Sequence, residues 1–136
     1  MSVYGVTKTI EFCYGHRLLD YEGKCRNLHG HNGLLQVRIE SDSLDEQGMV
    51  MDFGDVNDVV KRWVDENLDH RMILWSRDPA VSVLTDLGEP LYLVDENPTA
   101  ENIAKLIFDN MIVRGLSVSE IRLWETSSSY ASYRRT

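Results

Sequence analysis

Two segments near the start of the chain alternate apolar and polar side chains, and a connection rich in histidine and cysteine joins them. The segments are residues 6–12 (VTKTIEF) and 33–41 (GLLQVRIES). Such alternation predicts strands with one face on a core and the other on solvent. We expect the strands to form a hairpin-like pair. The connection, residues 13–32, is long, and long loops in compact domains are usually functional.

Two later segments have helical periodicity. In the first, Asp52 is a suitable N-cap, and the apolar residues that follow at helical spacing are Phe53, Val56, Val60, Trp63 and Val64. The second begins after Pro98-Thr99, ends at Gly115, and carries Ile103, Leu106, Ile107 and Met111 on one face. Further strands are expected within 89–98 and 117–126. This order predicts an α+β sheet with helices on one face, and the absence of a linker predicts a single domain, residues 1–136.

Composition restricts the partners. A length of 136 residues suits one hydrophobic core. The net charge of -8 argues against nucleic acid, because backbone binding needs clustered Lys and Arg, although a few cations in a cleft still suit an anionic small molecule. Without a signal peptide or an apolar run of about 20 residues, we expect a cytoplasmic protein with no membrane partner.

The stretch KCRNLHGHN, residues 24–32, concentrates metal-binding side chains. On an extended segment His29 and His31 point to the same side, and His16 closes the first strand, so a hairpin-like pairing would bring three imidazoles together. Three imidazoles plus water is the ligand set of a catalytic zinc site. An isolated H-x-H pair is weak evidence by itself.

Cys25 has two interpretations. As a fourth ligand it would close the metal shell and make the zinc structural, whereas outside the shell its thiol is free for proton transfer. Cys13 is expected to be a small buried residue without a partner. His70, preceded by Asp69, is either a base at a helix-terminal loop or a solvated residue, and spacing does not show that it meets Cys25.

Six features occur together in order: His16, Cys25-x-x-x-His29-Gly30-His31, and the segments GMVMDFGDV, LDHRMIL, NPTAENIA and WET. In this the chain resembles the 6-pyruvoyltetrahydropterin synthase and 6-carboxytetrahydropterin synthase family, from about Ile10 to about Thr126. The resemblance implies a tunnelling fold: a four-stranded antiparallel sheet with two helices on one face, closed into an oligomeric β-barrel. It also implies a homohexamer, a dimer of trimers, with active sites at subunit interfaces.

The resemblance also implies roles for residues. The zinc ligands fall on His16, His29 and His31, the catalytic residues on Cys25, Asp69 and His70, and the pterin-anchoring carboxylate on Glu125. Thr99 and Glu101 match the helix start, where capping is the first role and a substrate contact the second. Arg17, Lys24 and Arg26 are candidates for contact with a triphosphate, with ordinary solvation as the alternative.

The implied substrate is 7,8-dihydroneopterin triphosphate. The three-residue gap between Cys25 and His29 resembles the branch that forms 6-carboxytetrahydropterin and releases acetaldehyde and triphosphate for queuosine and other deazapurines. The alternatives are the pyruvoyl branch, or a structural-zinc or pterin-binding relative without this reaction. Gly33, where an aromatic residue often stands, the FCYGHRL segment and the SSSYASY tail depart from the family pattern.

Overall fold

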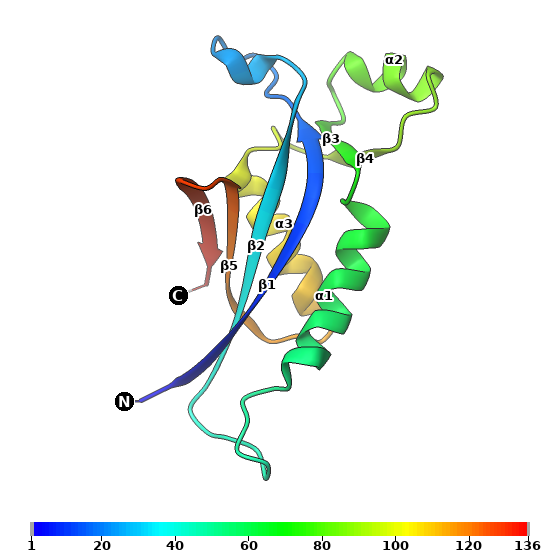
Figure 1. Cartoon of the computed structure of the whole chain (residues 1–136). Helices are drawn as coiled ribbons and strands as arrows, with labels where there is room; N and C mark the ends of the chain where they lie inside the picture. The colour runs from blue at the N-terminus through cyan, green and yellow to red at the C-terminus, as the bar shows by residue number, and fades with distance from the viewer. Residues whose placement is uncertain (1, 136) are drawn as a thin grey trace.

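The structure is a computed structural model that describes residues 2–135, and within them one curled sheet carries the helices (Figure 1). The strands are β1 (Tyr4–His16), β2 (His29–Ser41), β3 (Arg71–Trp75), β4 (Leu91–Val94), β5 (Val118–Thr126) and β6 (Ser129–Arg134), and the sheet order is β4-β3-β1-β2-β5-β6. The helices are α1 (Phe53–Asn67), α2 (Ala80–Asp86) and α3 (Ala100–Val113), with a short 3₁₀ turn, η1 (Lys24–Arg26).

The predicted α+β class is confirmed, but the expected four-stranded antiparallel sheet is wrong in two respects. The sheet of the described residues has six strands, and β3 pairs in parallel with both β1 and β4. The two strands absent from the sequence prediction are β3 and β6. β3 is a short apolar run without alternation, and β6 is an exposed edge strand with little apolar signal, so neither shows a clear period of two.

The β1–β2 pair is longer than the sequence suggested, and this places the candidate ligands. The antiparallel register runs from Tyr4 opposite Ser41 to His16 opposite His29. The connection is therefore 17–28 and not 13–32. The extra ladder carries histidine, glycine and asparagine in place of alternating apolar residues, so the apolar alternation ends before the strands do.

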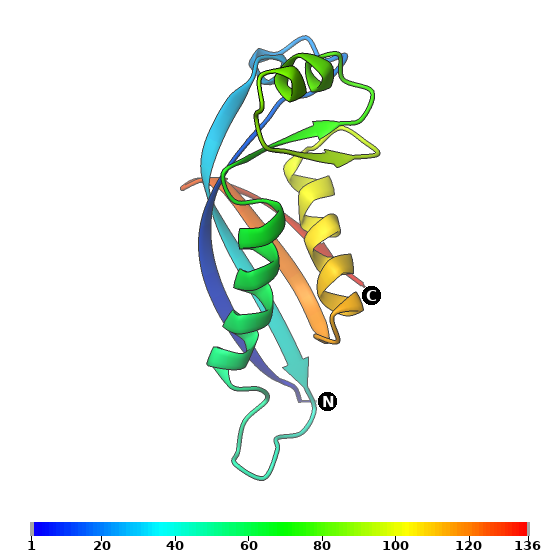
Figure 2. The same ribbon diagram turned by 90° about the vertical axis from the view of Figure 1, so that its right-hand side faces the viewer.

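Both long helices lie on the same face of the sheet (Figure 2). The Asp52 side chain accepts from Gly54 N at 2.7 Å, which confirms the predicted N-cap of α1. Gly115, at φ +86°, follows the end of α3 as expected, because glycine adopts this left-handed conformation without steric cost.

The core lies between this sheet face and the two helices, and it includes Leu35, Val37, Val60, Ile107 and Leu123. The inward faces of β2 and β5 and the buried faces of α1 and α3 supply these residues. Phe12 and Tyr14 extend this core along β1 as far as His16, so the core supports the ends of β1 and β2, where the candidate ligands lie.

Over residues 2–135, none of the helices has the length and apolar character to cross a bilayer.

Candidate active site

Three histidine side chains meet where β1 and β2 end. His16 and His29 are cross-strand partners, and His31 shares their face of the sheet because residues two apart on a strand point the same way. One ring nitrogen from each lies within 4.8 Å of the others, and the Nε2 atoms of His16 and His31 are 3.1 Å apart. The structure thus brings together the three ligands that the sequence predicted.

Backbone carbonyls orient two of these rings. Nδ1 of His16 lies 2.7 Å from the carbonyl oxygen of Pro98, and Nδ1 of His29 lies 2.7 Å from that of Asn27. A carbonyl only accepts, so each Nδ1 carries the proton and each Nε2 presents a lone pair to the cluster. Burial lowers the pKa of His16, and the contacts with Pro98 and Glu125 only partly oppose this. His16 is therefore neutral and able to bind a metal at neutral pH.

This donor set fits a zinc ion. Nitrogens bound to tetrahedral zinc at about 2.0–2.1 Å lie roughly 3.3 Å apart, close to the His16–His31 separation. The cluster found among the described residues contains the three histidines and neither cysteine nor carboxylate. A fourth position is then left for a small-molecule ligand, which is the arrangement of catalytic zinc sites.

Glu125 lies beside the cluster on β5. Its two carboxylate oxygens are each 3.8 Å from an Nε2, one from that of His16 and the other from that of His31. The side chain is 28% exposed, so its acceptor oxygens remain open to a ligand. The structure therefore places the predicted pterin anchor next to the predicted metal ligands.

Cys25 lies on η1, in the connection between β1 and β2, and its side chain is half-buried. Its carbonyl oxygen accepts from the Leu18 amide at 2.8 Å, which closes the connection on itself. The thiol is not one of the atoms gathered in the histidine cluster. This agrees better with a free thiol than with a four-ligand structural shell.

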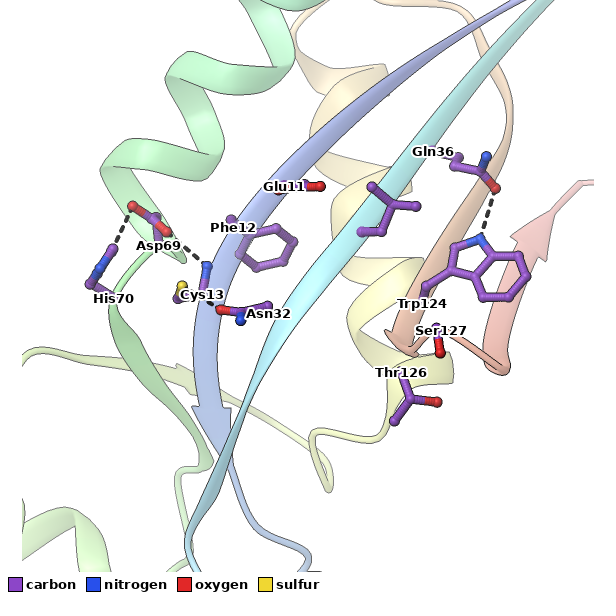
Figure 3. Close-up of a pocket in the computed structure, with 11 residues that line it drawn as sticks. Glu11, Phe12, Cys13, Asn32, Gln36, Asp69, His70, Trp124, Thr126 and Ser127 are labelled. Carbon is purple, nitrogen blue, oxygen red and sulfur yellow. Dashed lines mark hydrogen bonds and ion pairs between the residues drawn. The ribbon is translucent and has the colours of Figure 1, made fainter.

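Asp69 and His70 form a hydrogen-bonded pair in the turn just before β3 (Figure 3). Nδ1 of His70 donates to Asp69 Oδ2 at 2.8 Å, and the other oxygen of Asp69 accepts from the Cys13 amide at 3.0 Å. Burial would raise the pKa of Asp69, but the Cys13 amide and His70 outweigh it and lower the pKa. The ionised Asp69 thus fixes the His70 tautomer and leaves Nε2 free for proton transfer.

His70 lines two cavities. The larger, about 790 Å³, is also lined by Glu11, Asn32 and Trp124, and the smaller, about 340 Å³, by His29 and His70 together. No direct hydrogen bond joins His70 to the histidine cluster within residues 2–135. The structure therefore places His70 and one of the three clustered histidines, His29, at a shared cavity, and it does not bring His70 into contact with the cluster.

The remaining predicted residues are placed as follows. Arg17 is bound to the buried carboxylate of Asp78 through Nε at 2.7 Å and through Nη2, so its guanidinium already has a structural partner. Lys24 and Arg26 are exposed on η1. The Thr99 hydroxyl accepts from Asn102 N at 3.1 Å and caps α3, as expected, while Glu101 is exposed in the first turn.

The expectation for Cys13 is wrong. The thiol is half-buried within β1 and donates to Asn32 Oδ1 at 3.0 Å, and it lines both cavities beside His70. The apolar alternation ends at Phe12, and it therefore predicts that Cys13 lies at the end of the strand without a partner. In the paired strands Cys13 and Asn32 are cross-strand neighbours.

Two polar residues near the site had no role in the sequence prediction, although one of them, Tyr14, belongs to the FCYGHRL segment that departs from the family pattern. Tyr14 is buried against the rings of His16 and His31, with centroid distances of 5.4 and 5.5 Å. Asn97 forms two hydrogen bonds with the backbone of Leu19, at 2.7 and 2.9 Å. Only the position of Tyr14, two residues before His16 on the same strand face, offered a signal.

A family model described as 6-pyruvoyl tetrahydropterin synthase matches residues 5–136. The chain belongs to the 6-pyruvoyl tetrahydropterin synthase family. Among named relatives, it is 40% identical over 131 residues to a 6-carboxy-5,6,7,8-tetrahydropterin synthase of Rickettsia felis, covering 91% of this chain and 95% of the relative. A protein of the same name from Haemophilus influenzae is 36% identical over 140 residues, covering 97% and 99%.

Two solved structures have folds similar to that of this chain. An uncharacterized protein from Wolinella succinogenes is 30% identical and superposes with a TM-score of 0.83 over the whole of both chains. The 6-pyruvoyl tetrahydropterin synthase of Caenorhabditis elegans, 21% identical, superposes with a TM-score of 0.73 over 100% of this chain and 98% of its own, which shows that the fold is the same. The resemblance inferred from the six sequence features is confirmed.

Proposed function

We propose that the protein is a zinc-dependent 6-carboxy-5,6,7,8-tetrahydropterin synthase. It would convert 7,8-dihydroneopterin triphosphate to 6-carboxytetrahydropterin with release of acetaldehyde and triphosphate, on the route to queuosine and related deazapurines. The observation that carries the proposal is the cluster of His16, His29 and His31 beside Glu125, in a chain whose named relatives are synthases of this product. The three-residue gap between Cys25 and His29 favours the same branch.

Zinc bound at the three Nε2 atoms would supply a Lewis acid for the oxygen atoms of the substrate side chain. Glu125 would bind the pterin ring, because its two carboxylate oxygens match the amino group and the ring N–H of a 2-aminopyrimidinone. A ligand can reach the carboxylate because the Glu125 side chain is 28% exposed.

Proton transfer would involve the two remaining groups. Cys25, outside the metal cluster, would remove a proton from the substrate side chain, and His70 would return one through Nε2. Asp69 supports His70 by holding its Nδ1–H, with Asp69 itself tied to the β1 backbone at Cys13. Lys24 and Arg26 are the exposed cations available for the triphosphate, whereas Arg17 is already paired with Asp78.

We also propose a homohexamer, a dimer of trimers, with active sites between subunits. Family membership supports this, and so do the edge strands β4 and β6, with which a second subunit could pair. Light scattering should give six times the 15.6 kDa chain mass. A monomer at micromolar concentration would contradict the assembly. The cytoplasmic location expected from the sequence stays a prediction.

The role of Cys25 is tested by Cys25→Ala, with Cys13→Ala as the matched cysteine control. We expect Cys25→Ala to keep one zinc per subunit and to lose turnover by about 10²-fold or more, the usual contribution of a positioned base. Cys13→Ala should keep most of both. Zinc content is measured by mass spectrometry of the metal and turnover by triphosphate release.

Loss of zinc together with turnover in Cys25→Ala would contradict the role of Cys25 as a base. It would favour a closed shell in which the thiol is a fourth ligand and the metal is structural. Unchanged turnover with zinc retained would also contradict that role, because another group would then remove the proton.

A further inference from the structure

The hydroxyl group of Tyr14 is buried without a hydrogen-bond partner. The residue is 3% exposed, and its Oη is the one buried side-chain polar atom among residues 2–135 that lacks a partner. Burying a hydroxyl without a hydrogen bond costs free energy, so such a group calls for a specific explanation, often a ligand. The location of this hydroxyl suggests which ligand.

The Tyr14 ring extends from β1 across β2. A Cβ atom added to Gly33 would lie 2.9 Å from Cε1 of Tyr14 and 3.4 Å from Cδ1. One edge of the ring therefore lies over Gly33, and only the absence of a side chain there allows it. Phe12 stacks on the Tyr14 ring, with 5.2 Å between the ring centroids, and so helps to hold the ring in place.

On the side of Gly33 away from β1, the neighbouring strand is β5, and its residue next to Gly33 is Glu125. β5 adjoins β2 on the side away from β1 (Figure 1), and Leu34 pairs with Trp124, so Glu125 lies next to Gly33 in the register. A tyrosine hydroxyl carries its proton at neutral pH, so in this position it is a hydrogen-bond donor on the same side of the sheet as Glu125.

The two groups together match one edge of a pterin. That edge presents an amino group, a ring N–H and a carbonyl oxygen side by side: two donors and then an acceptor. Glu125 offers two acceptors, and a neighbouring donor would complete the set. We propose that Tyr14 is a specificity-determining residue whose hydroxyl donates a hydrogen bond to the ring carbonyl oxygen of a pterin held by Glu125. This inference rests on the proposed function, because it requires a pterin substrate.

The test compares two ligands that differ at this edge of the ring. The ligands are 6-hydroxymethylpterin, which has the carbonyl oxygen and the ring N–H, and 2,4-diamino-6-hydroxymethylpteridine, in which an amino group replaces the carbonyl oxygen and the neighbouring ring nitrogen carries no hydrogen. The change at the ring nitrogen affects Glu125 in every variant alike, so the difference between variants reports on Tyr14. Dissociation constants are measured by fluorescence titration for the zinc-loaded wild type, Tyr14→Phe and Tyr133→Phe. Tyr133 is a half-buried tyrosine on β6 that packs on Phe108 at 5.0 Å, so Tyr133→Phe removes a hydroxyl from a different aromatic cluster.

We expect Tyr14→Phe to weaken binding of 6-hydroxymethylpterin about tenfold and to leave or improve binding of the diamino compound, so that the preference of the wild type shrinks. Tyr133→Phe should bind both ligands as the wild type does. Without ligand, Tyr14→Phe should melt at the same temperature as the wild type or higher, because the hydroxyl that it removes has no partner in the protein.

Two results would overturn the inference alone: a preference in Tyr14→Phe equal to that of the wild type, or a lower melting temperature, which would show that the hydroxyl has a partner in the protein. Failure of the wild type to bind either pteridine would instead contradict the proposed function, and the inference with it. The readout is binding, so it is independent of turnover.

Discussion

At the scale of single residues, Arg17 shows how a cation near a site can serve the fold. The sequence suggested contact with a triphosphate, but the guanidinium binds the buried Asp78, whose carboxylate also accepts from Ala80 N at 2.8 Å. The hydrogen bond from Arg17 lowers the pKa of Asp78 despite its burial. This ion pair joins the end of β1 to the start of α2.

Replacing Arg17 with Met should leave a buried, unpaired carboxylate and reduce the free energy of unfolding by about 3 kcal/mol at pH 7. A carboxyl group with a lowered pKa stabilises the fold above its unfolded pKa, here 3.8, and this contribution is lost as the pH falls through the lower folded value. The difference between Arg17→Met and the wild type should therefore be full at pH 7 and shrink below about pH 3.8.

Urea unfolding at pH 7 and pH 3 measures this difference. Lys105→Met is the control, because it breaks the exposed Lys105–Asp109 pair on α3 and should change little at either pH. An Arg17→Met variant as stable as the wild type at pH 7 would show that Arg17 is free to serve the substrate.

The metal ligands were predictable from sequence and Tyr14 was not. His29 and His31 alternate on a strand, and that local geometry follows from spacing alone. The partner of His16 depends on the register of β1 and β2, which local patterns predict only approximately. The position of the Tyr14 ring depends on the missing side chain at Gly33, a cross-strand relation that no local pattern records.

At the scale of elements, the connection 17–28 that carries Cys25 is anchored near its start to the segment before α3. Asn97 accepts from the Leu19 amide at 2.7 Å and donates to the Leu19 carbonyl at 2.9 Å. Its own carbonyl accepts from the Asn102 side chain at 2.9 Å, and Leu18 in turn bonds to Cys25. These hydrogen bonds, joined through the backbone between Leu18 and Leu19, therefore connect α3 to the Cys25 segment.

Asn97→Ala should loosen this connection and lower kcat at least about tenfold with little change in KM, since small displacements of a reacting group are costly. The matched control is Asn110→Ala, which removes a single side-chain hydrogen bond inside α3. Hydrogen exchange at Leu18 and Leu19, zinc content and kcat are measured for both variants. Equal kcat and equal exchange in the two variants would contradict a positioning role for Asn97.

The long elements were predicted well and the short ones poorly. α1 and α3 combine an amphipathic period with capping residues, so the residues of each helix themselves indicate its bounds and its buried face. β3 and β6 have few residues and weak patterns, and the sheet itself supplies their hydrogen-bond partners. For the same reason β1 and β2 extend beyond their apolar alternation, since pairing holds the polar ends in the ladder.

At the scale of the whole molecule, the sheet has one face covered by α1 and α3 and edge strands at β4 and β6 (Figure 2). Edge strands with unpaired backbone groups favour pairing with another chain. The sequence could indicate the α+β class but not these edges, because β6 was not recognised. The closed barrel therefore stays a proposal, which rests on family membership and on these edge strands.

The most direct test of the central claim is the product formed from 7,8-dihydroneopterin triphosphate. The zinc-loaded protein is incubated with this compound, and the pterin and aldehyde products are identified by mass spectrometry, with a metal-free sample as control. We expect 6-carboxytetrahydropterin and acetaldehyde in equal amounts, formed only with zinc. A pyruvoyl-pterin, or unchanged substrate in the presence of bound zinc, would contradict the proposed function.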